Sequence, residues 1–147
     1  MSLANRLEIP ADLDAWLRET RRMIHMRPEL LCEEHQTSEL VQKHLTELGV
    51  TFRSGVGGDG RPLYMSPEII ERAGIKTFPT TGGTGVLGEI KGTRGRGEGK
   101  VVLLRADMDA LPIEEANDVE YKSQSPGKMH ACGHDCHTTI LLGVAEV

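Results

Sequence analysis

The run Val101-Val102-Leu103-Leu104 is the feature that most restricts how this chain can fold. All four positions are apolar, so the run lacks the alternation of a strand with one wet face. It is typical of a central strand that helices cover on both faces. Residues 86–90 predict a second strand, and the glycine-rich residues 92–99 suit an exposed, hairpin-like turn between the two. Because strands and helical patterns mix along the chain, we expect an α/β fold with three-layer packing.

Amphipathic helices are predicted ahead of these strands. The first runs from about residue 12 to about residue 25, with apolar side chains at helical spacing. The second covers residues 38–48, with Thr37 or Ser38 as its N-cap and Gly49 as its C-terminal cap. Three more elements are expected: a short strand at residues 50–52, a short helix at residues 66–74, and the first turns of a helix from residue 138.

Composition bounds the class of protein. The chain has 147 residues and a formal net charge of −5, which suits one globular domain. The acidic balance disfavours a nucleic-acid partner. No apolar run approaches the roughly 20 residues that span a bilayer, and the first six residues do not form a secretory signal. Three cysteines without a framework spacing favour a reducing compartment. We therefore expect a cytoplasmic protein without a membrane or nucleic-acid partner, and a homo-oligomer stays open.

Two carboxylates follow the predicted buried strand directly. Asp107 and Asp109 lie two residues apart, just after Leu104. Ligands of open α/β sheets bind outside the carboxyl ends of the strands, so this is a suitable place for a functional site. The alternative also stays open: both carboxylates can cap the next element or pair with Arg105.

The densest group of chemistry-bearing residues runs from Lys128 to Thr138 and holds three histidines and two cysteines. Imidazole and thiolate suit zinc, cobalt, nickel or manganese sites. Cys132 and His134 flank a glycine and can both point inward on a tight loop, and Asp135 can then orient a ligand imidazole. The alternative is a loop of exposed histidines and buried cysteines. A closed structural zinc site is a further alternative, but the chain lacks the second Cys/His knuckle of such sites.

Two motifs, LRADMDALPIEE at residues 104–115 and MHACGHD at residues 129–135, resemble the M20 metallopeptidase family. Within it, the chain is most similar to the amidohydrolase branch of aminoacylases, hippurate hydrolases and auxin-conjugate hydrolases. The pattern of residues 22–37 is also like the opening helix and loop of that family. Residues 57–84 depart from it and resemble an insertion before the strand that starts at Val86.

The resemblance implies a three-layer αβα, zinc-peptidase-like fold with a mixed central sheet. Residues 1–147 are then expected to form the N-terminal part of the metal-binding catalytic domain, with the rest of that domain and any satellite domain absent from them. The resemblance also implies that Cys132 and His134 are metal ligands, with the thiolate shared between two ions.

The resemblance further implies where the catalytic and supporting residues lie. The family's His-x-Asp motif falls on Asp107-Met108-Asp109, so the catalytic carboxylate is Asp109 or Asp107, with Asp109 favoured. Asp135 and His130 are expected to support the ligands. No catalytic role is expected for the remaining candidates. Glu114 and Glu115 are expected at a solvated helix start, and Cys32 and Cys136 as small buried thiols. The imidazoles of His25, His35 and His44 are expected to be structural or exposed.

The leading functional hypothesis is a metal-dependent amidohydrolase that cleaves N-acyl amino acids or similar, peptide-like conjugates. It implies divalent ions, two per complete protein, of zinc, manganese, cobalt or nickel. The second hypothesis is a catalytically inactive fragment or binding module, because two ligands do not hold a catalytic zinc. A thiol redox protein using Cys132 and Cys136 is disfavoured, since their spacing is not Cys-x-x-Cys. We expect residues 1–147 alone to be inactive, because the glutamate base and the remaining ligands are not among them.

Overall fold

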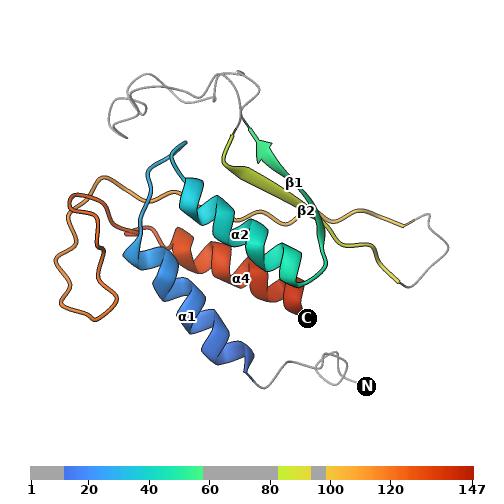
Figure 1. The fold of residues 1–147 in the computed structure, drawn as a ribbon, viewed down its shortest axis with the longest axis horizontal. Helices are drawn as coiled ribbons and strands as arrows, with labels where there is room; N and C mark the ends of the chain where they lie inside the picture. Colours follow the sequence, from blue (N-terminus) through green and yellow to red (C-terminus); the bar gives the residue numbers. More distant parts are fainter. Residues whose placement is uncertain (1–11, 58–82, 94–98) are drawn as a thin grey trace.

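The computed structural model describes residues 12–57, 83–93 and 99–147 of the chain. Along these residues the order of elements is α1 (Leu13–Met26), α2 (His35–Glu47), β1 (Thr51–Val56), β2 (Gly85–Glu89) and α4 (His134–Glu146). In Figure 1 the three helices lie side by side and the two strands form a ribbon next to α2. The predicted α/β class is thereby confirmed. The predicted short helix at residues 66–74 lies outside the described residues, as does nearly all of the expected insertion at residues 57–84.

Helix α1 follows the predicted amphipathic pattern closely, since it covers Leu13–Met26 and stops just ahead of Pro28. Its buried face, which includes Ile24, packs against α4. The two helices lie close together at Gly143 of α4. A Cβ atom at Gly143 would lie 2.8 Å from Leu17 Cδ2, so the glycine allows the close contact.

Helix α2 begins two to three residues earlier than predicted, because its N-terminus is capped by a side chain from outside the helix. The Glu29 carboxylate accepts hydrogen bonds from the backbone N–H groups of Gln36 and Thr37, each at 2.9 Å, and from the Thr37 hydroxyl. Carboxylates are favourable at this end of a helix, where N–H groups lack intrahelical partners. The predicted cap at the other end is confirmed: Gly49 has φ +68°, and its N–H donates to Thr46 O.

The strands β1 and β2 pair antiparallel, from Thr51 opposite Glu89 to Val56 opposite Gly85, with an irregularity between Ser54 and Val56. The close approach at Gly85 requires a glycine, because a Cβ atom there would lie 2.6 Å from Val56 O. The predicted strands at residues 50–52 and 86–90 are thus found, each with shifted ends. The expected hairpin of residues 86–90 with 101–104 is not found among the described residues, where β2 pairs with β1.

The prediction of a buried strand at residues 101–104 is also wrong for this structure. These residues form no strand, and their apolar side chains are exposed, with Val101 at 94%. A strand needs a neighbour to satisfy its N–H and C=O groups, and no strand among the described residues pairs with this run. Its side chains line one wall of an apolar groove of about 370 Å³, whose other walls are α2, β2 and α4.

The small core lies between the helices and the sheet. Its buried residues are Val41 and Leu45 of α2 and Leu142 of α4, and half-buried apolar side chains pack around them: Trp16, Val50, Phe52, Val86, Met108 and Ala145. Helix α4 starts at His134, four residues earlier than predicted, after Gly133 in the left-handed conformation at φ +94°. This early start places the histidine-rich segment on the first turn of a helix.

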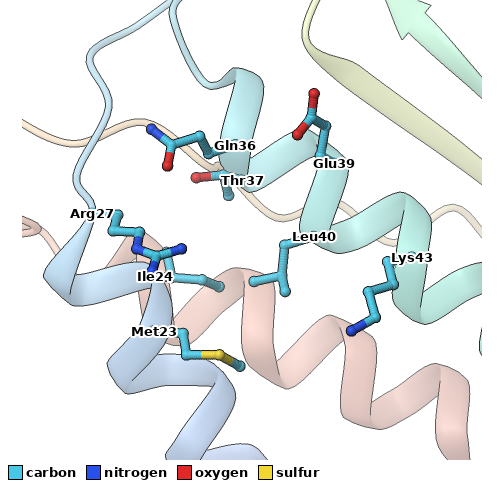
Figure 2. Close-up of a pocket in the computed structure, with 8 residues that line it drawn as sticks. All are labelled: Met23, Ile24, Arg27, Gln36, Thr37, Glu39, Leu40 and Lys43. Carbon is cyan, nitrogen blue, oxygen red and sulfur yellow. The ribbon is translucent and has the colours of Figure 1, made fainter.

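Figure 2 shows a cleft of about 260 Å³ between α1 and α2, lined by Met23, Ile24, Arg27, Gln36, Thr37, Glu39, Leu40 and Lys43. None of the carboxylates and histidines predicted for the site lines it. The helices in the described part of the chain are all too short or too polar to cross a membrane.

Candidate metal centre

Backbone hydrogen bonds bring the two sequence motifs together. Leu111 N–H donates to Met129 O at 2.9 Å, and Met129 N–H donates to Leu111 O at 3.0 Å. On its other side, Ala110 N–H donates to Glu29 O at 2.7 Å. The segment after residue 104 is therefore held between the loop before α2 and the segment that leads into α4. Asp107 and Asp109 of the first motif thereby lie close to His134 of the second.

His134, the first residue of α4, is held in a defined orientation. Its Nδ1 lies 2.8 Å from the main-chain oxygen of Asp109 and 3.0 Å from Asp109 Oδ1. The main-chain oxygen can only accept a hydrogen bond, so Nδ1 carries the proton and donates it. The other nitrogen, Nε2, keeps its lone pair in that tautomer. It lies 4.0 Å from Asp107 Oδ2.

His134 belongs to a group of three side chains with metal-ligand chemistry. One ligand atom each from Asp107, His134 and His137 lies within 4.8 Å of the others. The two imidazoles are one helical turn apart and their ring centroids are 5.5 Å apart. The Thr138 hydroxyl donates to Asp107 O at 2.9 Å and fastens this loop to α4. Asp107 also pairs with Arg105 through Oδ1, as one of the alternatives for this residue foresaw.

Cys132 lies two residues before α4 and carries an exposed, free thiol. It is not part of the group formed by Asp107, His134 and His137. Its role as a ligand therefore stays a prediction. His137 is not among the residues predicted for the site, although its position three residues after His134 is the signal for two imidazoles on one face of a helix.

His130 is buried at 4% exposure, and neither ring nitrogen has a hydrogen-bond partner among the described residues. Burial and, to a lesser extent, the nearby His25 and His134 lower the pKa of His130 to about 4. The imidazole is therefore neutral at pH 7 and has its lone pair free. Unpartnered buried nitrogens are rare and point to an absent ligand, ion or water.

Asp135 and Glu115 do not occupy the surroundings predicted for them. Asp135 was expected to orient a ligand imidazole, but its Oδ2 lies 2.8 Å from His25 Nδ1, and Asp109 takes the place beside His134. The prediction of a solvated Glu115 is wrong, since Glu115 is 2% exposed and bonded to His25. Of the histidines without an expected catalytic role, His25 and His44 are buried and His35 is exposed.

The side chains present fit a divalent metal ion. Two imidazoles and a carboxylate are a common donor set for zinc, manganese, cobalt and nickel. His134 already has the arrangement typical of a metal ligand, in which one ring nitrogen donates to a carboxylate or carbonyl and the other is free. The neutral, unpartnered His130 lies in the same region, near Asp109 and His134.

Comparison with known proteins shows what the chain is similar to. Residues 103–147 match the sequence profile of peptidase family M20/M25/M40. The chain is 42% identical to the IAA-amino acid hydrolase ILR1-like 5 of Arabidopsis thaliana over 147 residues, which is all of this chain and 26% of that protein. It is 38% identical to the N-acyl-L-amino acid amidohydrolase of Geobacillus stearothermophilus, over 95% of this chain and 29% of that protein.

Among solved structures, the fold is similar to the YXEP protein of Bacillus subtilis, a dinuclear metal-binding peptidase of the M20 family. The TM-score is 0.67 at 32% identity, and the match covers 90% of this chain and 30% of that one. The chain spans about a quarter of the length of the curated relatives that it matches. These findings confirm the resemblance predicted from the motifs, and residues 103–147 carry the sequence pattern of the M20 peptidase family.

Proposed function

We propose that the complete protein is a metal-dependent hydrolase that cleaves the amide bond of N-acyl amino acids or similar conjugates. The observation that carries this proposal is the orientation of His134, with Nδ1 on Asp109 and a free Nε2 directed toward Asp107. It lies in the segment that matches the M20 family. The relatives named above act on amino-acid conjugates or N-acyl amino acids, which share an amide bond next to an amino acid.

The proposed ligands are His134 and Cys132, joined by Asp107 and His137 from the group around His134. The ion is zinc, manganese, cobalt or nickel, and a pair of ions is supported by the dinuclear centre of the similar Bacillus protein. When bound, a divalent ion supplies Lewis acidity toward a carbonyl oxygen and toward water.

The chain's own side chains supply orientation and charge. Asp109 accepts a hydrogen bond from His134 Nδ1 through its main-chain oxygen, which fixes the tautomer, and its carboxylate, 3.0 Å from the same nitrogen, helps to set the direction of the ring. Asp107 directs its second oxygen toward His134 and brings a negative charge that offsets that of a cation. We assign the catalytic, orienting role to Asp109 rather than to Asp107, because Asp109 contacts the proton-bearing nitrogen and Asp107 faces the free one.

We also propose that residues 1–147 form the N-terminal part of a three-layer αβα catalytic domain with a mixed sheet. In this arrangement residues 101–104 pair with strands from elsewhere in the complete protein. Their exposed apolar side chains and the groove beside them support this, because apolar patches of this kind are rarely left open to water. The three free cysteines support a cytoplasmic location.

An activity assay with a set of metals tests the proposal. The complete protein is freed of metal with a chelator and supplied with zinc, manganese, cobalt or nickel. It is then assayed on N-acetyl and N-benzoyl amino acids by release of the free amino group. We expect metal-dependent hydrolysis that His134→Ala abolishes and that the exposed variant Lys43→Ala retains. Metal binding without hydrolysis of any substrate would instead favour a binding module of this fold.

A further inference from the structure

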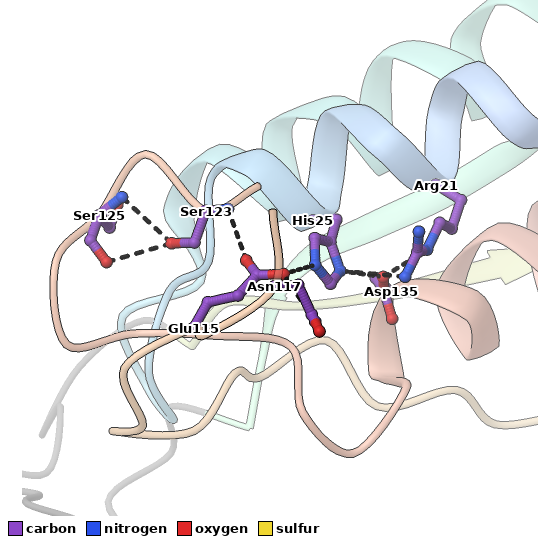
Figure 3. Close-up of polar contacts among 7 residues, drawn as sticks. All are labelled: Arg21, His25, Glu115, Asn117, Ser123, Ser125 and Asp135. Carbon is purple, nitrogen blue, oxygen red and sulfur yellow. Dashed lines mark hydrogen bonds and ion pairs between the residues drawn. The ribbon is translucent and has the colours of Figure 1, made fainter. Parts of the chain in front are cut away.

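Four titratable side chains, three of them buried and one (Arg21) partly exposed, form a row of contacts next to the candidate metal centre (Figure 3). Asp135 Oδ2 lies 2.7 Å from Arg21 Nε and 2.8 Å from His25 Nδ1. On the other side of the imidazole ring, His25 Nε2 lies 3.2 Å from Glu115 Oε1. We call Arg21, His25, Glu115 and Asp135 the buried charge network.

The network connects three segments that are far apart in the sequence. Arg21 and His25 lie on α1, one turn apart, and Asp135 lies on the first turn of α4. Glu115 lies on the loop of residues 113–125. His25 joins this loop to the start of α4, because its ring contacts Glu115 of the loop on one side and Asp135 of α4 on the other (Figure 3).

The loop end of the network is also tightly bonded. Glu115 Oε2 accepts the backbone N–H of Ser123 at 2.7 Å, and Oε1 accepts Asn117 Nδ2 at 3.2 Å. Burial raises the pKa of Glu115, but the hydrogen bonds from Ser123, Asn117 and His25 outweigh it and lower the pKa overall. The Glu115 carboxylate is therefore fixed in position at the loop end of the network.

Stability of the fold alone does not account for this arrangement. Asp135 has no exposed surface and Glu115 is 2% exposed, so two carboxylates have been taken out of water. Desolvation of buried ion pairs offsets most of their attraction, and apolar side chains of similar volume often stabilise a fold as well or better. Such pairs are better suited to fixing where one element lies relative to another.

We propose that the buried charge network positions the first turn of α4, so that His134 and His137 face the metal site together. Asp135 follows His134 directly, and successive side chains of a helix point about 100° apart. Asp109 holds His134 on one side of the turn, and the network holds Asp135 on another. Two anchors in different directions fix the rotation of the turn about its axis. Arg21, His25 and Glu115 are positioning residues, because they act through Asp135.

This inference rests on the proposed function, since it assigns the network to the metal site of the proposed hydrolase. Titration of the complete protein with Co²⁺, followed by its visible absorption, tests it in three variants: Glu115→Gln, His25→Gln and Arg21→Lys. Arg21 is partly exposed, so its variant is expected to fold even if the other two do not. The matched control is Asp14→Asn, which breaks an exposed pair with Arg18 on the same helix.

We expect the dissociation constant for Co²⁺ to rise tenfold or more in the network variants that fold, and to stay unchanged in Asp14→Asn. Thermal unfolding of each variant shows how much of it is folded. Lower melting temperatures with an unchanged Co²⁺ affinity would mean that the network only stabilises the fold, and would overturn the inference.

Amide hydrogen exchange without metal separates the inference from the proposed function. The N–H groups of Cys136 and His137 both donate to Gly133 O in the first turn of α4. We expect these amides to exchange faster in Glu115→Gln, while amides in the second half of α4 keep their protection. Uniformly faster exchange along α4 would contradict the inference. A wild-type protein that binds no Co²⁺ would overturn the proposed function, whatever the exchange pattern.

Discussion

Replacement of Asp109 by asparagine tests how His134 is oriented. The substitution keeps the size of the side chain and the main-chain oxygen, which lies 2.8 Å from His134 Nδ1. It removes the charge of the carboxylate, whose Oδ1 lies 3.0 Å from the same nitrogen. Loss of such a supporting partner typically weakens metal binding or activity about 10–100-fold. Because the main-chain oxygen still fixes the tautomer, we expect the low end for metal affinity, about tenfold or roughly 1.4 kcal/mol.

Turnover is expected to fall more than affinity, by about 10–100-fold, since the orienting charge acts on a ligand of the reacting centre. The assay combines metal titration with steady-state kinetics at saturating metal. Asp107→Asn is the matched comparison. Asp107 lies beside the free nitrogen of His134, so we expect this variant to lose the bound metal. Wild-type affinity and turnover in Asp109→Asn, with both lost in Asp107→Asn, would refute the assignment of roles.

Three further predictions concern single residues. Cys132→Ala should abolish metal binding and hydrolysis together, as metal analysis and an activity assay of one preparation will show; full metal content with full activity would exclude Cys132 as a ligand. Glu29→Ala removes three hydrogen bonds at the start of α2. We expect the free energy of unfolding to fall by about 2 kcal/mol and Tm to fall by about 4–8 °C. The control variant Glu33→Ala, at an exposed side chain, should change Tm little. Folding lowers the pKa of Glu115 below its ordinary value of 4.5. The ionised carboxylate therefore contributes its full stabilisation above pH 4.5, and this contribution is lost as the pH falls through the pKa of Glu115 in the folded protein. Urea unfolding should therefore show a larger loss in Glu115→Gln at pH 7 than at pH 3, and an equal loss at both would contradict this.

The helices could be predicted because their signals are local. Apolar side chains at helical spacing marked α1, and Gly49 marked the end of α2 at a left-handed position. The start of α2 was misplaced because its cap comes from Glu29, six residues before the helix, and no pattern within the helix reveals it. The start of α4 was misplaced for a similar reason: Gly133 was taken as part of a loop, although it directly precedes the helix.

The candidate site could be predicted in its residue types but not in its contacts. Clustered histidines and spaced aspartates were visible in the sequence, and the structure brings Asp107, Asp109 and His134 together. The partners of Asp135 and Glu115 could not be predicted, because His25 lies 110 and 90 residues away from them and its pattern is that of any helix residue. The run at residues 101–104 was misjudged because the burial of a strand depends on neighbours that need not be near in the sequence.

Metal content and hydrolysis, measured together in the complete protein, test the proposed hydrolase. Metal-free protein is titrated with Mn²⁺ or Zn²⁺, the bound ions per chain are counted by elemental analysis, and turnover of an N-acyl amino acid is followed in the same samples. We expect turnover to rise with bound metal to a normal enzyme rate, roughly 1 s⁻¹ or more, and to reach its maximum at about two ions per chain, as in a dinuclear peptidase. Hydrolysis that persists at full rate after complete removal of the metal would contradict this expectation, as would a protein that binds no ion at all.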